Sequence, residues 1–396
     1  MLYADSKGKI LEAALPPRHE CRGFRSEELM NKPVYVTQSS LPSCEDFIRC
    51  VRSIFASRHM TNGGRYATEL EQALTRHLKA GCLALCANGT LALQLTIRLL
   101  GLHGKKVITT PYTYVATVSA LLWEQCTPVF ADIDTQTLCL SPEAVHRQLR
   151  LHPDAAGILP VHVYGNACDT AALESLGKEH GIPVLYDAAH AFGSRLWGKH
   201  LPTYGDAAIC SFHATKLFHT VEGGCVVTPR PEDLSRLRLL RAFGHDGDNH
   251  QCLGINAKIS ELHAAMGVCL LPGMADILDQ RRRKAAIYNE ALEAGREHGL
   301  TRPRLADGLE WNHAYYPIIF PDNVTMRNAL AALKARNIHP RRYFYPSLTR
   351  LPYLPGQSCP VAEDITERVL CLPFWPDMDE AIIRQISSIL LEQWEK

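Results

Sequence analysis

The chain has 396 residues, of which 46% are hydrophobic and 21% are charged, an ordinary balance for a globular protein that excludes disordered and fibrous classes. Its formal net charge of +1 provides no field that would collect nucleic acid or an anionic membrane, so we expect neither partner. The 14 cysteines include no CxxC pair and no closely spaced set with histidine, and we interpret them as reduced thiols of a cytoplasmic protein without a metal site.

The first segment, residues 1–29, carries charges throughout and lacks the apolar core of a secretory signal. Met30 resembles a second possible start of translation. We therefore expect residues 1–32 to form an extension outside the fold. No stretch of the chain reaches the roughly 18 consecutive apolar residues of a membrane span.

Short runs rich in apolar or β-branched residues recur between residues 82 and 229 and predict strands. Most of the segments between them have apolar residues at helical spacing, which predicts repeated βα units and a mainly parallel sheet. Only about ten residues separate the last two runs, fewer than a parallel crossover needs, so the last strand is expected to be antiparallel. The predicted strands are Cys82–Ala87, Lys106–Pro111, Pro128–Asp134, Ala156–Tyr164, Pro183–Ala189, Ala207–Phe212 and Gly223–Thr228, and the clearest helices between them are Thr90–Leu102, Ser141–Leu151 and Thr170–Gly181.

The pattern changes after about residue 245, where a long helical stretch over Ser260–Gly299 precedes a second αβ unit. Its basic run, Arg281–Lys284, is expected to form a solvated helix face. Two strand-like runs flank a helix over Thr325–Asn337, and a final amphipathic helix begins near Asp379. We predict an α/β protein with a large domain over residues 33–245, containing a seven-stranded sheet with one antiparallel strand, and a smaller α/β domain over residues 246–396.

Two residues at strand ends suggest the chemistry. Lys216 follows the sixth predicted strand, and Asp187 ends the fifth. A lysine amine condenses with an aldehyde cofactor as a Schiff base, and a carboxylate beside the pyridine nitrogen of such a cofactor keeps that nitrogen protonated. The pair therefore indicates a pyridoxal phosphate site, with Lys216 as the catalytic group. The alternatives are an exposed surface lysine and an aspartate that caps a helix.

Further candidates follow other strands, and the carboxyl ends of parallel strands meet at one edge of the sheet. Gly89 and Thr90 open a helix and, with Ser211, are suited to hold the cofactor phosphate. Tyr114 would stack on the pyridine ring, and His190 could bind the phenolic oxygen of the cofactor. The alternative for Gly89 and Thr90 is a turn with a helix cap. The alternative for Tyr114 is a core aromatic, and that for His190 is a core histidine.

At these residues the chain resembles the DegT/DnrJ/EryC1/StrS family of sugar aminotransferases, which are fold type I enzymes dependent on pyridoxal 5'-phosphate, and the similarity runs from about Pro33 to the C-terminus. The matched stretches are Thr61–Gly64, Ala87–Thr90, Thr113–Thr117, Tyr186–Gly193, Ser211–Gly224, Gly254–Glu261 and Val369–Pro373.

The resemblance implies a homodimer with two shared active sites, in which Asn256 reaches the phosphate of the cofactor in the neighbouring subunit. It also supports the roles given above to the other candidates. Two positions depart from the family: Lys258 stands where arginine is usual, and Ala257 stands where an aromatic is common. Because arginine and lysine differ in hydrogen-bond geometry, no role is carried over to position 258.

Four stretches are most similar to family members that aminate dTDP-4-keto-6-deoxy-D-glucose at C4: Asn31–Pro42, Val161–Asn166, Phe243–Gly247 and Arg341–Pro346. The resemblance thus implies a nucleotide-sugar substrate and L-glutamate as amino donor. A C3 aminotransferase acting on a dTDP-3-keto sugar is the first alternative. A second is a sugar dehydratase of the same family, but that class replaces the lysine with histidine, so Lys216 argues against it. A non-catalytic regulatory protein on the same fold is the third.

Overall fold

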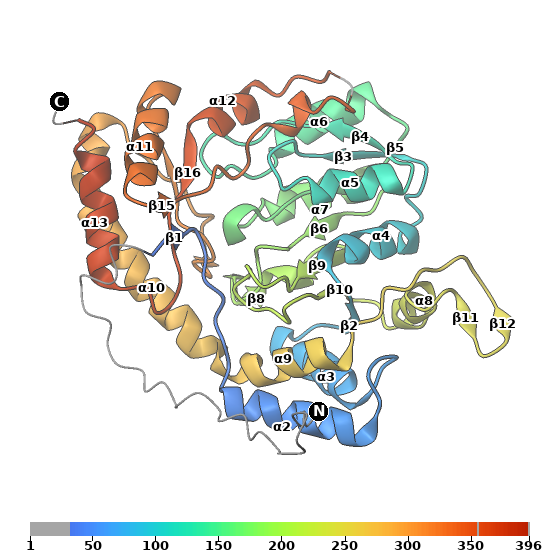
Figure 1. Cartoon of the computed structure of the whole chain (residues 1–396). Helices are drawn as coiled ribbons and strands as arrows, with labels where there is room; N and C mark the ends of the chain where they lie inside the picture. Colours follow the sequence, from blue (N-terminus) through green and yellow to red (C-terminus); the bar gives the residue numbers. More distant parts are fainter. Residues whose placement is uncertain (1–31, 355, 395–396) are drawn as a thin grey trace, which may run out of the picture.

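The computed structural model describes residues 32–354 and 356–394 (Figure 1). The extension predicted over residues 1–32 falls, apart from its last residue, outside the described residues.

A central sheet holds the seven predicted strands: β2 (Cys82–Cys86), β3 (Lys106–Thr109), β4 (Thr127–Phe130), β5 (Ala155–Leu159), β6 (Leu185–Asp187), β9 (Ala207–Ser211) and β10 (Gly224–Thr228). Hydrogen bonding joins them as β2-β10-β9-β6 and β4-β3-β5, and parallel bridges from Ile158 to Val184 and from Val161 to Asp187 connect β5 to β6. β10 runs antiparallel to both of its neighbours. The predicted fold class and the single antiparallel strand are confirmed.

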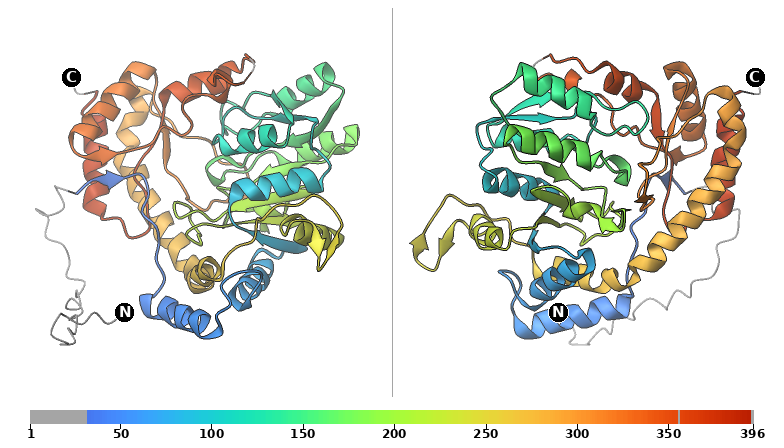
Figure 2. Two further views of the ribbon diagram at one scale, coloured as in Figure 1. Left: turned by 45° about the vertical axis from the view of Figure 1, so that its right-hand side comes forward. Right: turned by 180° about the vertical axis from the view of Figure 1, so that it is seen from behind.

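Helices cover this sheet, which explains why its strands are mostly apolar (Figure 2). Every residue of β2 and of β10 is buried. The helices that follow the strands are α4 (Gly89–Leu99), α5 (Ala116–Trp123), α6 (Pro142–Leu151) and α7 (Thr170–His180). The side chains of Asn88, Ser141 and Asp169 cap α4, α6 and α7 by accepting a backbone N–H of the first turn, so polar residues in the sequence fix where these helices begin.

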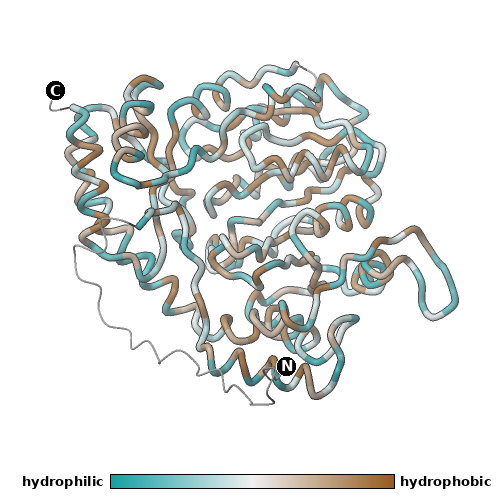
Figure 3. Tube along the Cα trace, in the orientation of Figure 1, coloured by the Kyte–Doolittle hydropathy of each residue, from teal (hydrophilic) through white to brown (hydrophobic). Residues whose placement is uncertain are grey.

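Much of the C-terminal part packs around a second hydrophobic core, although buried residues such as Ala264 and Ala362 belong to the core of the central sheet. Its elements are α9 (Glu261–Leu270), α10 (Met274–Ala291), β13 (Leu309–Glu310), β14 (Pro317–Ile319), α11 (Asn323–Ala335), β15 (Ile338–His339), α12 (Pro360–Arg368), β16 (Val369–Cys371) and α13 (Glu380–Leu391). β14 pairs antiparallel with β16. In Figure 3 hydrophobic and hydrophilic segments alternate along α13, whose buried residues include Ile383, Ile386 and Leu390. The second αβ unit and the final helix are confirmed.

Several elements join the two parts. β1 (Val34–Tyr35) pairs parallel with β15, and α9 packs against α2 (Cys44–Ser57) and α3 (Arg65–Leu78). The stretch Glu261–Ala291 is apolar and long enough to cross a membrane by length and composition alone, a test that the core helix of a soluble protein also passes. The domain limits at residues 33, 245 and 246 stay predictions.

Short elements complete the fold: β7 (Arg195–Leu196), β8 (Lys199–His200), α8 (Glu232–Leu240), β11 (His245–Asp246) and β12 (Asn249–His250). β11 and β12 form a hairpin that, with α8, projects from the body of the molecule (Figure 1).

One expectation about the surface is wrong. The basic run is helical, since it lies in α10, but Arg281 is only 2% exposed. Its guanidinium donates to the backbone carbonyls of His313 and Ala314 and lies over the ring of Phe374. Burial lowers the pKa of Arg281 to about 10. The helix turns one member of the run inward, and only Arg282 and Arg283 remain on the solvated face.

Candidate active site

The register of the sheet brings several predicted residues to one edge. Gly224, the first residue of β10, lies opposite Cys86 on one side and Ser211 on the other. Asp187 pairs with Ile209, two residues before Ser211. The chain leaves β2, β6 and β9 at this edge, as the sequence predicts.

Gly89 and Ser211 are direct neighbours at this edge. A Cβ atom added to Gly89 would lie 2.9 Å from the Cβ of Ser211, so a larger residue could not occupy the position without displacing the strand end. The amides of Gly89 and Thr90 precede the first hydrogen bond within α4, and the side chain of Asn88 caps Leu91 instead. The hydroxyls of Thr90 and Ser211 make no side-chain hydrogen bond to the residues that the structure describes. Free donors at a positive helix end suit an anion.

Asp187 is buried, with 4% of its surface exposed. Its carboxylate accepts a hydrogen bond of 2.7 Å from the hydroxyl of Thr117 and one of 3.0 Å from the amide of Ala189. Burial raises the pKa of the Asp187 carboxyl, while these two hydrogen bonds and the charge of Lys216 act to lower it. Asp187 has no ion pair within hydrogen-bond distance among the residues that the structure describes, and a buried carboxylate of this kind gains most from a cation placed against it.

The amine of Lys216 lies in a small cavity lined by Ala189, His190, Phe192, Ser211, Thr215, Leu217, Ala314 and Tyr315. Its Nζ donates to the hydroxyl of Tyr315 at 3.2 Å. Burial lowers the pKa of Lys216, and the charge of Asp187 raises it in part. A lowered pKa favours the neutral amine, which is the form that attacks an aldehyde.

His190 lines the same cavity and is 7% exposed. Its Nδ1 accepts the backbone N–H of Tyr164 at 3.2 Å, so the neutral ring carries its proton on Nε2 as a donor. Burial and the charge of Lys216 hold the pKa of His190 well below its ordinary value. The ring of Phe344 stacks on it with centroids 5.7 Å apart.

Two predicted residues are exposed and so do not belong to this buried cluster. Tyr114 is 56% exposed, and its carbonyl accepts the N–H of Thr117, whose hydroxyl binds Asp187, so its ring is free beside the site. Asn256 is exposed, and its Oδ1 accepts a hydrogen bond of 2.7 Å from Lys258. Asn256 forms no hydrogen bond with the other candidates within the described part of the single chain.

Sequence reasoning missed Thr117, Tyr315 and Phe344. Thr117 lies within a stretch that the family resemblance covers, so the sequence indicated that it lies near the site. It did not indicate that Thr117 binds Asp187. Tyr315 and Phe344 come from the C-terminal part, and no local pattern points to them.

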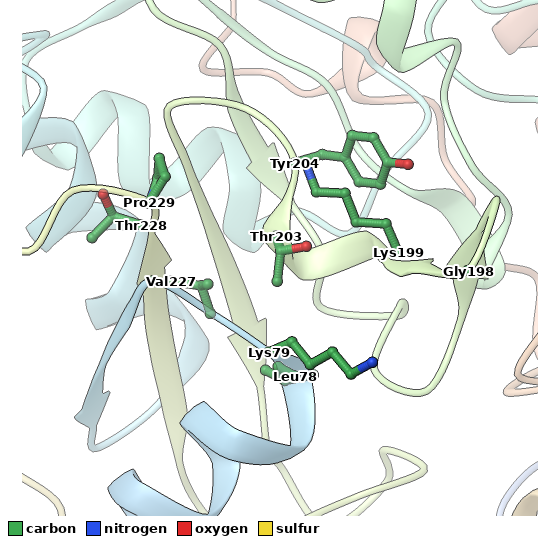
Figure 4. Close-up of a pocket in the computed structure, with 10 residues that line it drawn as sticks. Leu78, Lys79, Gly198, Lys199, Thr203, Tyr204, Val227, Thr228 and Pro229 are labelled. Atoms are coloured by element: carbon green, nitrogen blue, oxygen red, sulfur yellow. The ribbon is translucent and has the colours of Figure 1, made fainter.

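A larger cavity of about 410 Å³ lies elsewhere, at the far end of β10. Figure 4 shows Lys199 extending beside the ring of Tyr204, with Nζ 4.1 Å from the ring centroid. The cavity is also lined by Leu78, Thr203 and Thr228, and it contains none of the predicted site residues.

Comparison with known proteins shows the family of the chain. Residues 43–391 match the DegT/DnrJ/EryC1/StrS aminotransferase family. The chain belongs to this family. It is 36% identical over 370 residues to a dTDP-4-amino-4,6-dideoxy-D-glucose transaminase of Shigella dysenteriae, with 92% of this chain and 100% of that protein covered. A protein of the same name from Escherichia coli is 32% identical over 373 residues, with 91% and 99% covered.

A solved structure agrees with this assignment. The structure of DesI in the presence of its TDP-sugar product is 33% identical and superposes with a TM-score of 0.84, covering 91% of this chain and 92% of that one. The chain is accordingly an aminotransferase of fold type I that depends on pyridoxal 5'-phosphate.

The residues present fit this cofactor. The unsatisfied amides and hydroxyls at Gly89, Thr90 and Ser211 suit a phosphate, the buried carboxylate of Asp187 suits a pyridinium nitrogen, and the amine of Lys216 lies in the same cavity as Ser211.

Proposed function

We propose that the enzyme transfers the amino group of L-glutamate to a dTDP-linked 4-keto-6-deoxyhexose and so forms the 4-amino sugar. The placement of Lys216 and Asp187 on one sheet edge, in a chain of which 92% aligns with a dTDP-4-amino-4,6-dideoxy-D-glucose transaminase, carries the proposal. DesI, which was solved with a TDP-sugar product, supports the nucleotide-sugar class.

Each candidate has a role in holding the cofactor. The amides of Gly89 and Thr90, with the hydroxyl of Ser211, bind the phosphate, and Asp187 binds the ring nitrogen. Nε2–H of His190 donates to the phenolic oxygen, and the exposed ring of Tyr114 covers the face of the pyridine. When bound, pyridoxal phosphate supplies an electron sink for the carbon that loses its proton.

Lys216 carries the proton in both half-reactions. In the first half-reaction its neutral amine takes the proton from the amine-bearing carbon of glutamate and would pass it to the reacting carbon of the bound cofactor. Water then releases 2-oxoglutarate, and the nitrogen would stay with the cofactor. In the second half-reaction the keto oxygen of the sugar leaves as water, and Lys216 takes a proton back from the cofactor carbon and gives it to the sugar carbon that receives the nitrogen. A single lysine serves two substrates in turn, so the kinetics should be ping-pong. Burial supports this role because it brings the pKa of Lys216 down toward the working range of a base.

The active unit that we propose is a homodimer with two shared sites. Asn256 is exposed and forms no hydrogen bond with the other candidates among the described residues, although the carbonyl of the next residue, Ala257, accepts the N–H of Ala87. Phe243, Leu253 and Ile255, on either side of the projecting hairpin, expose 52%, 75% and 37% of their surface, which suits a contact with a second copy. In that arrangement Asn256 reaches the cofactor phosphate of the partner subunit.

Mixing two inactive variants tests the shared site. Asn256→Asp would place a carboxylate against the phosphate and repel it by a few kcal/mol, so cofactor affinity should fall on the order of 100-fold. Lys216→Ala chains mixed with Asn256→Asp chains should regain activity, because the heterodimer holds one site with both defects and one with neither. Absence of recovery, when subunit exchange has been demonstrated by mass, would contradict a shared site.

The substrate is tested directly with a panel of nucleotide sugars. Purified enzyme receives glutamate with 4-keto and 3-keto hexoses on dTDP and on UDP, and mass spectrometry with NMR identifies the carbon that gains nitrogen. We expect the dTDP-4-keto-6-deoxyhexose to react with the highest kcat/KM. Preferential amination at C3 would support the 3-aminotransferase alternative, and a chain that binds cofactor but consumes no glutamate would support a regulatory protein.

A further inference from the structure

One contact at the site has no place in the roles above. Tyr315 lies between β13 and β14, far along the chain from Lys216, and is 6% exposed. Its hydroxyl accepts the hydrogen bond from Nζ of Lys216 at 3.2 Å and makes no other hydrogen bond to the described residues. The proton of this hydroxyl is therefore free to be donated in turn.

Two buried side chains hold the segment that carries Tyr315. Nη1 of Arg281 donates to the carbonyls of His313 and Ala314, both at 3.1 Å, and Arg281 has no salt bridge within the described residues. Asn312 donates to the carbonyls of His190 at 2.7 Å and Phe192 at 2.9 Å. Its Oδ1 accepts the amide of Ala314 at 3.0 Å. The buried side chains of Arg281 and Asn312 thus both hold the backbone next to Tyr315 in place.

The ring of Tyr315 is enclosed by other aromatic rings. The centroid of His190 lies 4.7 Å away, that of Tyr343 lies 5.6 Å away in an edge arrangement, and that of Tyr164 lies 5.9 Å away. Close packing of this kind leaves the ring little freedom to move, so the hydroxyl stays where the lysine amine meets it.

We propose that Tyr315 is the positioning residue of Lys216, and that its hydroxyl holds the ε-amine whenever that amine is not bonded to the cofactor. The proposal rests on the role given to Lys216 in the proposed function. A phenol suits both protonation states of the lysine: its oxygen accepts from the ammonium, and its O–H donates to the lone pair of the neutral amine. The proton taken from glutamate therefore arrives on an amine whose direction is fixed.

Tyr315→Phe keeps the packed ring and removes only the hydroxyl, and Tyr316→Phe is its matched control. Tyr316 is buried, and its hydroxyl donates to Oδ1 of Asn289 at 2.8 Å, so that variant also loses one partly buried hydrogen bond of a tyrosine but none at Lys216. We expect Tyr315→Phe to lower kcat on the order of 10-fold or more, with little change in KM for glutamate. The deuterium isotope effect with glutamate deuterated at its reacting carbon should increase, because proton transfer becomes slower than the other steps. Tyr316→Phe should show neither change.

Borohydride reduction keeps this test separate from the proposed function. The reduced wild-type protein and the reduced Tyr315→Phe variant should both carry the cofactor on the peptide that contains Lys216. An unlabelled Lys216 in the wild-type protein would contradict the proposed function itself. If Lys216 is labelled but kcat and the isotope effect of Tyr315→Phe equal those of the wild type, or if Tyr316→Phe changes them equally, Tyr315 does not position the lysine.

If Tyr315→Phe fails to fold, a second substitution tests the proposal. 3,5-Difluorotyrosine at position 315 keeps the shape of the side chain and makes its hydroxyl more acidic. The pH profile of kcat should then shift relative to that of the wild type, and an unchanged profile would overturn the proposal.

Discussion

Lys216→Ala should give a folded protein with almost no transaminase activity. We expect kcat to fall about 10²- to 10⁴-fold or more, since that range is typical for the loss of a general acid and base. The variant removes the amine that shares a cavity with His190 and Ser211. Folding should be little affected, because the amine makes one side-chain hydrogen bond, to Tyr315, and an unpaired tyrosine hydroxyl costs about 1 kcal/mol. Steady-state kinetics with glutamate and the keto sugar measure the loss.

Covalent trapping gives a second reading of the same variant. Borohydride should fix the cofactor to the wild-type chain and not to Lys216→Ala. Lys199→Ala is the control, since the amine of Lys199 lies over the ring of Tyr204 beside a cavity without predicted site residues. Trapped cofactor in Lys216→Ala, or wild-type turnover, would show that another amine does the chemistry.

Much of the site could be predicted because its residues stand next to strands. Asp187 and Ser211 end β6 and β9, Gly89 begins the helix after β2, and parallel strands deliver their carboxyl ends to one edge whatever the loops do. The strands themselves were predictable because most of their residues are buried, and β2 and β10 are buried along their whole length, so they form nearly continuous apolar runs in the sequence.

Contacts between distant segments could not be predicted. The bond from Thr117 to Asp187 and the bond from Lys216 to Tyr315 join residues with no common periodicity or motif. The basic run shows the same limit in a helix. Helical spacing indicates that one face turns inward, but four consecutive cations do not reveal which one, and packing against Phe374 selects Arg281.

The pairing of β1 with β15 could not be predicted either, because the two strands lie far apart in the chain. Two residues, Val34 and Tyr35, pair with Ile338 and His339. So short a strand carries no period in the sequence, and its partner is fixed only when the C-terminal part has folded.

Asp187→Asn should separate function from stability more sharply than any other variant. Burial raises the pKa of Asp187 in the folded chain, so ionising it costs folding free energy once the pH rises above the ordinary carboxyl value. In the cofactor-free protein at neutral pH, asparagine removes that cost. It can still accept one of the two hydrogen bonds from Thr117 and Ala189. The free energy of unfolding should therefore stay within about 1 kcal/mol of the wild type or increase.

With cofactor bound, the negative charge of Asp187 becomes favourable, because it keeps the ring nitrogen protonated. The same charge lowers the stability of the cofactor-free chain. Turnover of Asp187→Asn should fall about 10²- to 10³-fold, the loss typical of one preorganised electrostatic partner. Denaturant unfolding of the cofactor-free chains and kinetics of the loaded enzymes measure the two effects on the same preparations. Thr117→Val is the graded control: it keeps the carboxylate, removes one donor to it and should lose far less activity. Near-normal turnover in Asp187→Asn would show that the carboxylate is not needed for the mechanism. A large loss of stability in the cofactor-free variant would mean instead that the residue is needed mainly for folding.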